Sequence, residues 1–166
     1  MKQFDQLSLD AFCRLAKSFA IQLRPPMVVG LTGTLGAGKS QWVRGVANAL
    51  GVPTDQVTSP TFTLVQSYSA VHPLTGPLKL HHLDAYRVKD EDEFWELGVE
   101  ELFEEPDAVT FIEWADLFPE TLPMQRVDVS IEVIDPQHRR VTVDARETGL
   151  DVSRLNDDFI ASCDDR

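Results

Sequence analysis

The stretch MVVGLTGTLGAGKS occupies residues 27–40 and joins a short apolar run to a glycine-rich loop. Residues 27–31 are apolar without polar alternation, which is typical of a strand covered on both faces. Residues 33–40 satisfy the pattern G-x-x-x-x-G-K-[ST] at every fixed position. In residues 38–50 the apolar side chains recur on one helical face, and Gly51 supplies a stop. The pattern therefore lies between a predicted central strand and a predicted helix.

This strand, loop and helix arrangement is typical of a P-loop, which binds phosphate groups. Glycines let backbone N–H groups converge on phosphate oxygens, and the helix N-terminus adds partial positive charge. We expect Lys39 to reach the β- and γ-phosphates and the Ser40 hydroxyl to bind Mg²⁺. The alternative is a glycine-rich turn with an exposed lysine. An N-K-x-D signature for guanine is absent, so ATP is the expected nucleotide. The residues predicted to bind it in this segment are Gly33, Thr34, Leu35, Gly36, Ala37, Gly38, Lys39, Ser40 and Gln41.

The rest of the chain predicts one α/β domain over residues 1–166, with 150–166 as a tail that can fray. We expect a P-loop NTPase-type three-layer sandwich, with a mixed, mainly parallel sheet flanked by helices and a C-terminal β-hairpin. A first helix is capped by Ser8 and ends before the Pro25-Pro26 pair. Further predicted elements are strands at 62–68, 78–83 and 108–112, a helical acidic stretch, a hairpin of 126–134 with 139–145, and a last helix at 150–162.

Two acidic residues follow predicted strands and are candidates for catalysis. Glu113 ends the apolar run 109–112, and Asp84 ends the run 78–83. Because the carboxyl ends of parallel strands meet at one edge of a sheet, both acids are expected beside the phosphate loop. We predict that Glu113 holds Mg²⁺ together with Ser40, and that Asp84 shares the metal or orients the attacking water. For either acid alone, the alternative is an ordinary carboxylate at a strand end.

A hydroxyl-rich segment, residues 58–63, follows the loop helix at a separation suited to a nucleotide-sensing switch, and Thr61 is its candidate residue. A simple turn into the next strand is the alternative. His81 and His82 adjoin Asp84, but adjacent strand residues point to opposite faces, which argues against a two-histidine metal site.

Charge and cysteine content narrow the class of protein. The net charge of −12 and pI near 4.6 argue against a broad basic surface for nucleic acid, so any nucleic-acid role is expected to be indirect. Residues 90–107 carry ten acids and no base, which indicates a solvated helical face or a docking face for a basic partner. Cys13 and Cys163 fit free thiols in a reducing compartment, and no apolar run is long enough for a signal peptide or membrane span. A soluble, cytoplasmic protein without membrane contact is expected.

Four segments in order resemble the TsaE family, also called YjeE: GTLGAGKS at 33–40, SPTF at 59–62, HLDAYR at 82–87 and Glu-Trp at 113–114. The resemblance covers about residues 5–146, and the last three segments are more specific than the loop. It implies a small bacterial ATPase that assists synthesis of N6-threonylcarbamoyladenosine in tRNA. Such a protein docks on the TsaB and TsaD complex, which holds the tRNA, and its hydrolysis of ATP resets that machinery.

The resemblance also implies roles for single residues. Lys39 and Ser40 would bind phosphate and magnesium, Ser40 standing where many relatives have threonine. Asp84 and Glu113 would be the functional acids, Thr61 would belong to the switch, and Trp114 would line the nucleotide site or a partner contact. The predicted catalytic set is therefore Lys39, Thr61, Asp84 and Glu113, with Ser40 and Glu113 as metal ligands.

Two other functions are compatible with a P-loop. A small-molecule kinase needs an arginine-bearing lid over the transferred phosphate. The candidates are Arg87 and the Arg139-Arg140 pair, and the exposed face of a hairpin accounts for the pair. A non-catalytic adaptor would bind ATP or ADP and present the acidic helix to a partner.

Overall fold

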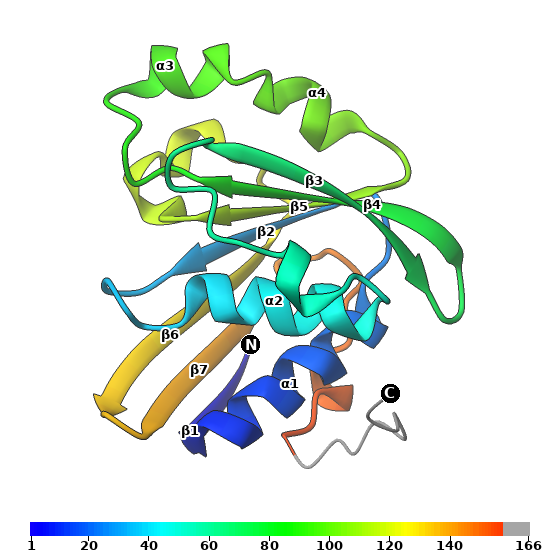
Figure 1. The fold of residues 1–166 in the computed structure, drawn as a ribbon, viewed down its shortest axis with the longest axis vertical. Helices are drawn as coiled ribbons and strands as arrows, with labels where there is room; N and C mark the ends of the chain where they lie inside the picture. The colour runs from blue at the N-terminus through cyan, green and yellow to red at the C-terminus, as the bar shows by residue number, and fades with distance from the viewer. Residues whose placement is uncertain (158–166) are drawn as a thin grey trace.

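A seven-stranded mixed sheet forms the centre of the fold, with helices on both of its faces (Figure 1). This computed structural model describes residues 1–157. In sheet order the strands are β1 (Lys2–Ser8), β7 (His138–Asp144), β6 (Val127–Asp135), β2 (Met27–Thr32), β5 (Ala108–Glu113), β4 (Gly76–Asp84) and β3 (Val65–His72). The pairs β6–β2, β2–β5 and β5–β4 are parallel, and the pairs nearer the two edges are antiparallel. The predicted α/β sandwich and its C-terminal hairpin are confirmed, with parallel pairing in the middle of the sheet.

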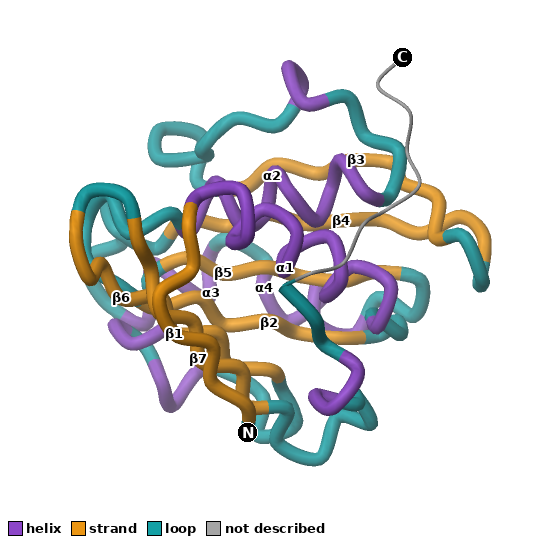
Figure 2. The backbone as a smooth tube through the Cα atoms, turned by 90° about the horizontal axis from the view of Figure 1, so that it is seen from below, coloured by secondary structure: helices purple, strands orange, loops and turns teal. Residues whose placement is uncertain are grey.

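The strand β2 lies at the centre because its side chains are buried on both faces, as its unbroken apolar sequence predicts. Figure 2 shows β1 beside β7 at one edge of the sheet and β3 beside β4 at the other. The carboxyl ends of β2, β5 and β4 therefore meet at one edge of the sheet.

One face of the sheet is covered by α1 (Leu9–Gln22) and α2 (Lys39–Ala49). Ser8 caps α1 as predicted, because its Oγ accepts a hydrogen bond from the Ala11 N–H at 3.2 Å. The rings of Phe12 and Phe19 both lie 5.5 Å from the ring of Trp42, in edge-on contacts that lock the two helices together. This packing fixes the position of the α2 N-terminus, where the glycine-rich loop ends.

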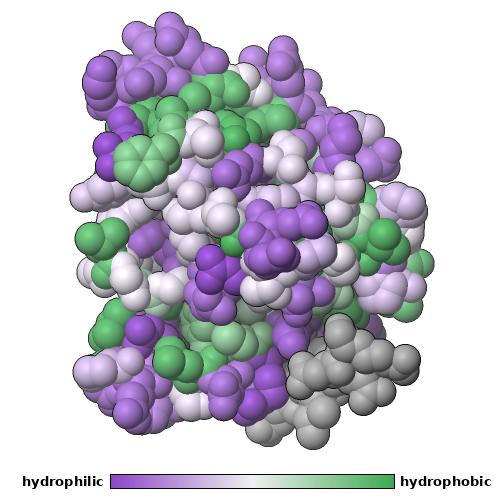
Figure 3. Space-filling view, in the orientation of Figure 1, coloured by the Kyte–Doolittle hydropathy of each residue, from purple (hydrophilic) through white to green (hydrophobic). Residues whose placement is uncertain are grey.

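The other face is covered by α3 (Glu91–Glu96), α4 (Val99–Glu104) and the short 3₁₀ helices η2 (Ala115–Leu117) and η3 (Pro119–Thr121). The acidic stretch is helical as predicted, but Gly98 divides it into two short helices. Phe94 and Val99 are buried under it, while most of its carboxylates are exposed to solvent. Hydrophilic side chains gather over α3 and α4 at the top of Figure 3, above a band of apolar side chains.

Three elements of the structure differ from the sequence predictions. The strand β1 was not predicted, because a register shift between Phe4 and Leu7 breaks the period-two pattern of its apolar side chains. The strand β3 begins at Val65 and not at residue 62, because the Leu64 N–H donates to Pro60 O at 2.7 Å and closes a turn. The predicted helix at 150–162 is wrong over 150–157, where only the 3₁₀ helix η4 (Val152–Arg154) forms.

The segment 150–157 nonetheless packs on the body of the domain. Leu155 is buried, and the Asn156 N–H donates to Ser18 Oγ at 3.1 Å. The remainder of the predicted helix and tail, with Cys163, lies outside the described residues. Cys13 is a free thiol, and within residues 1–157 no helix is long and apolar enough to cross a membrane.

Candidate functional site

The glycine-rich loop connects the carboxyl end of β2 to the N-terminus of α2. It is fixed by a hydrogen bond within the loop and by another from the strand β7. The Ala37 N–H donates to Thr34 O at 3.1 Å and closes a turn. Arg139 of β7 donates from Nε to Ala37 O at 2.9 Å. At Gly33, where φ is +145°, a Cβ atom would lie 2.4 Å from the backbone oxygen of Ile131. Only glycine fits there, so the loop is built to run close against β6.

Lys39 is buried at the mouth of α2. Its Nζ donates to Gly33 O at 2.7 Å and to Thr34 O at 3.0 Å, and lies 3.8 Å from the centre of the Trp114 ring. Burial lowers the pKa of Lys39, and nearby carboxylates, chiefly Glu113, oppose that shift. The ammonium group of Lys39 therefore lies against the loop backbone and close to the carboxylates of Glu113 and Asp84 on the neighbouring strands.

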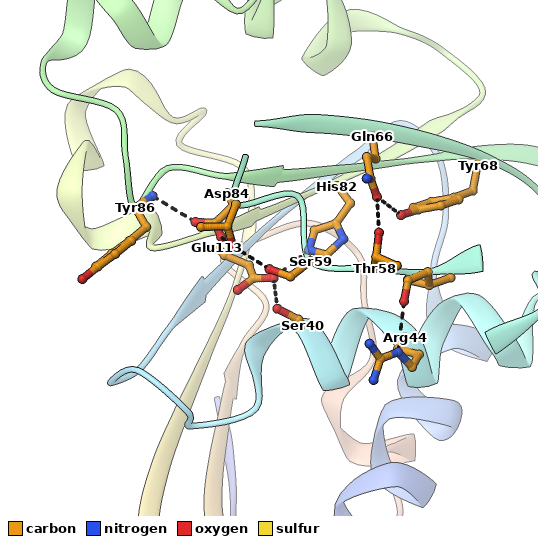
Figure 4. A network of polar contacts seen from close by, with 12 residues as sticks. Ser40, Arg44, Thr58, Ser59, Gln66, Tyr68, His82, Asp84, Tyr86 and Glu113 are labelled. Atoms are coloured by element: carbon orange, nitrogen blue, oxygen red, sulfur yellow. Dashed lines mark hydrogen bonds and ion pairs between the residues drawn. The ribbon is translucent and has the colours of Figure 1, made fainter. Parts of the chain in front are cut away.

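Glu113 and Ser40 meet at this edge of the sheet. The Ser40 hydroxyl donates to Glu113 Oε1 at 2.6 Å, and the same oxygen lies 2.7 Å from Nε2 of His82 (Figure 4). Glu113 and His82 are both buried. A hydroxyl that donates its only proton to a carboxylate keeps its lone pairs free for a cation. The pair predicted to hold Mg²⁺ is therefore in direct contact.

Asp84 lies beside Glu113 in the register of β4 and β5 and connects to the hydroxyl-rich segment. Its Oδ2 accepts a hydrogen bond from Thr61 Oγ1 at 2.9 Å, and its Oδ1 accepts from the Tyr86 N–H at 2.9 Å. The hydroxyls of Ser59 and Thr61 are 2.9 Å apart. The segment that was predicted to be a switch is therefore attached to the end of β4 through Asp84.

These groups line one open pocket of about 510 Å³. The rings of Tyr86 and Trp114 lie 4.9 Å apart on its wall, and the Arg87 guanidinium lies 4.5 Å from the centre of the Phe62 ring. Phe62 is 83% exposed, so this part of the rim presents an apolar side chain to solvent. The pocket-lining residues that the sequence predicted are Leu35, Gly36, Gly38, Lys39, Ser40, Gln41, Thr61, Asp84, Glu113 and Trp114.

The predicted residues Gly33, Thr34 and Ala37 do not line this pocket; they form the backbone that Lys39 and Arg139 hold. Ala37 and Gln41 also line a second pocket of about 300 Å³, on the side of the loop toward Phe12 and Cys13 of α1.

The donor set fits a phosphate group and a magnesium ion. No side chain caps α2 at Gly38, so its first N–H groups are available to an anion, and a Cβ added at Gly36 would meet no atom within 4 Å. Within residues 1–157, no group of three His, Cys, Asp or Glu side chains could hold a metal alone. Ser40 and Glu113 would thus need phosphate and water oxygens to complete the shell, which is how Mg²⁺ is commonly bound in nucleotide sites.

The pocket is also lined by residues that were not predicted as site residues, namely Arg44, Ser59, Tyr86 and Arg87. Two further residues, outside its lining, hold the site from behind. His81 and His82 point to opposite faces as expected, but His82 contacts Glu113, and its period-two relation to Asp84 would have placed it on the site face. Arg139 was assigned to an exposed hairpin face; that interpretation is wrong, because its side chain is bonded to the loop at Ala37.

Comparisons with known proteins agree on one family. The family model described as "Threonylcarbamoyl adenosine biosynthesis protein TsaE" matches residues 7–141. The chain is 38% identical over 135 residues to "tRNA threonylcarbamoyladenosine biosynthesis protein TsaE" of Bacillus subtilis, covering 81% of this chain and 78% of that protein. For the protein of the same name from Treponema pallidum, identity is 37% over 116 residues, covering 70% and 80%. A crystal structure of B. subtilis YdiB matches with a TM-score of 0.69 at 29% identity, covering 90% of this chain and 88% of that one.

Proposed function

Because the chain belongs to the TsaE family, we propose that it is a magnesium-dependent ATPase that assists the biosynthesis of N6-threonylcarbamoyladenosine in tRNA. The observation that carries the ATPase proposal is the 2.6 Å hydrogen bond from Ser40 at the mouth of α2 to Glu113 at the end of the adjacent parallel strand. It places a hydroxyl ligand and a carboxylate together beside Lys39. The family and the names of the relatives support the role in tRNA modification.

The loop side of the pocket binds the nucleotide in this proposal. Lys39 exchanges the carbonyl oxygens of Gly33 and Thr34 for oxygens of the β- and γ-phosphates. Ser40 would offer its lone pairs to the metal while its hydroxyl proton remains in the hydrogen bond to Glu113. Magnesium, when bound, neutralises the charge that develops on the phosphates during transfer. Trp114, which stacks on Tyr86, forms the wall next to the lysine.

The contacts support different roles for the two acids. Glu113 is bonded to the metal ligand Ser40 and is assigned to the metal shell. Asp84 is bonded to Thr61 and is assigned to the attacking water, which it would orient together with the Thr61 hydroxyl. Asp84 also holds the segment 58–63 through Thr61. A change at Asp84 between the ATP-bound and ADP-bound states would therefore shift this segment and its exposed residue Phe62.

The partners proposed are the TsaB and TsaD proteins. With a net charge of −12, the chain is poorly suited to hold tRNA itself, so the tRNA would be bound by the partners. The exposed Phe62 and Tyr86 stand beside the pocket, where a partner protein would contact the switch segment and the nucleotide at once.

ATP hydrolysis by the chain alone and with added TsaB and TsaD tests the proposal. We expect slow hydrolysis alone and a rate increase when both partners are present, because docking would order the switch segment around the γ-phosphate. An unchanged rate at saturating partner concentration contradicts the assignment to this machinery.

Alanine variants of the two acids separate an ATPase from a nucleotide-sensing adaptor. Glu113→Ala and Asp84→Ala are expected to retain binding of ATP and to lose hydrolysis. Full support of tRNA modification by both variants would favour the adaptor. The alternative of a small-molecule kinase needs an arginine on a lid over the transferred phosphate. Neither candidate is free for this, since Arg139 is hydrogen-bonded to the loop and Arg87 stacks on Phe62 at the rim.

A further inference from the structure

His82 is the most deeply buried polar side chain next to the pocket. It has no solvent exposure, and its Nε2 lies 2.7 Å from Glu113 Oε1. Its other nitrogen, Nδ1, is buried and has no hydrogen-bond partner among residues 1–157. A buried nitrogen without a partner costs free energy, whereas an apolar side chain at the same place would not. Packing alone therefore does not account for a histidine here.

The contact fixes one particular atom of Glu113. A carboxylate only accepts hydrogen bonds, so the proton of the contact belongs to Nε2 of His82. Ser40 donates to the same oxygen, Oε1, and the other oxygen of Glu113 receives no hydrogen bond from the described part of the chain. Two donors on Oε1 hold the carboxylate in one orientation and leave Oε2 for a cation or its water shell.

The two donors are not equivalent. Ser40 lies in the loop helix and is itself a proposed metal ligand, whereas His82 lies in β4, inside the sheet. Val65 and Leu83 pair across β3 and β4, and Leu83 pairs with Ile112 in β5, so β4 is bonded on both sides. His82 is therefore the donor whose position does not depend on the loop.

We infer that His82 is a positioning residue that orients Glu113 for magnesium, an inference that rests on the proposed nucleotide site. Donors to a carboxylate that ligates a metal, directly or through water, fix its orientation, and their removal commonly lowers metal affinity about 10- to 100-fold. The loss should fall on magnesium and not on the nucleotide itself, because Lys39 and the loop amides do not contact His82.

The test compares His82→Leu with a matched control, His81→Leu. His81 is the adjacent residue, is also buried, and also contacts a carboxylate, at 2.7 Å to Glu105, but on the opposite face of the sheet. Binding of ADP is measured by titration calorimetry, first in EDTA and then over a series of MgCl₂ concentrations. ADP is used because it is not hydrolysed. Magnesium is expected to raise the affinity for ADP, and the readout is the MgCl₂ concentration at which half of this increase is reached.

We expect His82→Leu to raise that concentration about tenfold or more, while affinity for ADP in EDTA changes less than about twofold. His81→Leu should match the wild type, and His82→Gln, which can still donate to Glu113, should recover part of the loss. Wild-type magnesium dependence in a folded His82→Leu variant would overturn the inference, as would an equal effect of His81→Leu. If His82→Leu does not fold, His82→Gln is compared with His82→Asn, whose shorter amide does not reach the position of Nε2. A weaker magnesium dependence in His82→Asn than in His82→Gln supports the inference, and equal values for both overturn it. Failure of the wild type to bind ADP at all would instead refute the proposed function.

Discussion

Alanine substitutions at two glycines of the same loop should differ in their effects on stability and on nucleotide binding. At Gly33, a Cβ would lie 2.4 Å from Ile131 O, about 1 Å inside an ordinary contact, and φ is +145°. The backbone strain costs about 1–3 kcal/mol and the overlap about 1–3 kcal/mol, so Gly33→Ala should lower the free energy of unfolding by about 4 kcal/mol. At Gly36, φ is +78° and no atom lies within 4 Å, so strain of about 1–2 kcal/mol is the only cost.

Thermal unfolding followed by circular dichroism measures the difference. For a chain of this size, Tm should fall by about 8–16 °C for Gly33→Ala and by about 2–8 °C for Gly36→Ala. Gly36→Ala should instead weaken binding of ATP, because its methyl group would occupy the open space that the phosphates need. Equal losses of Tm, or a larger loss at Gly36, would refute the argument that Gly33 is required by its contact with β6.

The remaining predictions concern the core and the response to pH. Phe12→Ala should lower the free energy of unfolding by about 3–5 kcal/mol, because Phe12 is buried against Trp42 and under Gly38; a loss below about 1 kcal/mol in urea unfolding would contradict this packing. Burial lowers the pKa of His72, whose Nδ1 accepts two backbone N–H groups, so the unfolded chain takes up a proton at a higher pH than the folded chain does. Stability should therefore decline as pH falls below the unfolded value of about 6.5, through the lower folded pKa. The decline between pH 7.5 and 5.5 should be smaller in His72→Asn, and equal declines would exclude His72 as its source.

Elements with a strong local pattern could be predicted from the sequence. The strand β2 and the helix α2 followed from an unbroken apolar run, a glycine-rich loop and a one-sided helical face. Asp84 and Glu113 followed from their places at strand ends, because parallel strands bring such residues to one edge. The candidate site could therefore be assembled before the fold was known.

Features that depend on distant contacts could not be predicted. The bulge in β1 hides its alternation, and its partner β7 lies at the far end of the sequence. Arg139 contacts Ala37 across 102 residues, so its place in a hairpin could not reveal its role. The segment 150–157 is held by contacts such as Arg14 Nε to Asp157 O at 2.9 Å, which supply order without a helix.

Binding of ATP by the glycine-rich loop is measured by titration calorimetry of ATP with MgCl₂ against the wild type and Lys39→Ala. Lys39 supplies the only side-chain ammonium that lines the described pocket, so its loss should abolish measurable binding without unfolding the chain. Saturable heat is expected for the wild type and none for the variant. Absence of heat with the wild type, or equal affinity of Lys39→Ala, would contradict the assignment of this loop as a nucleotide site.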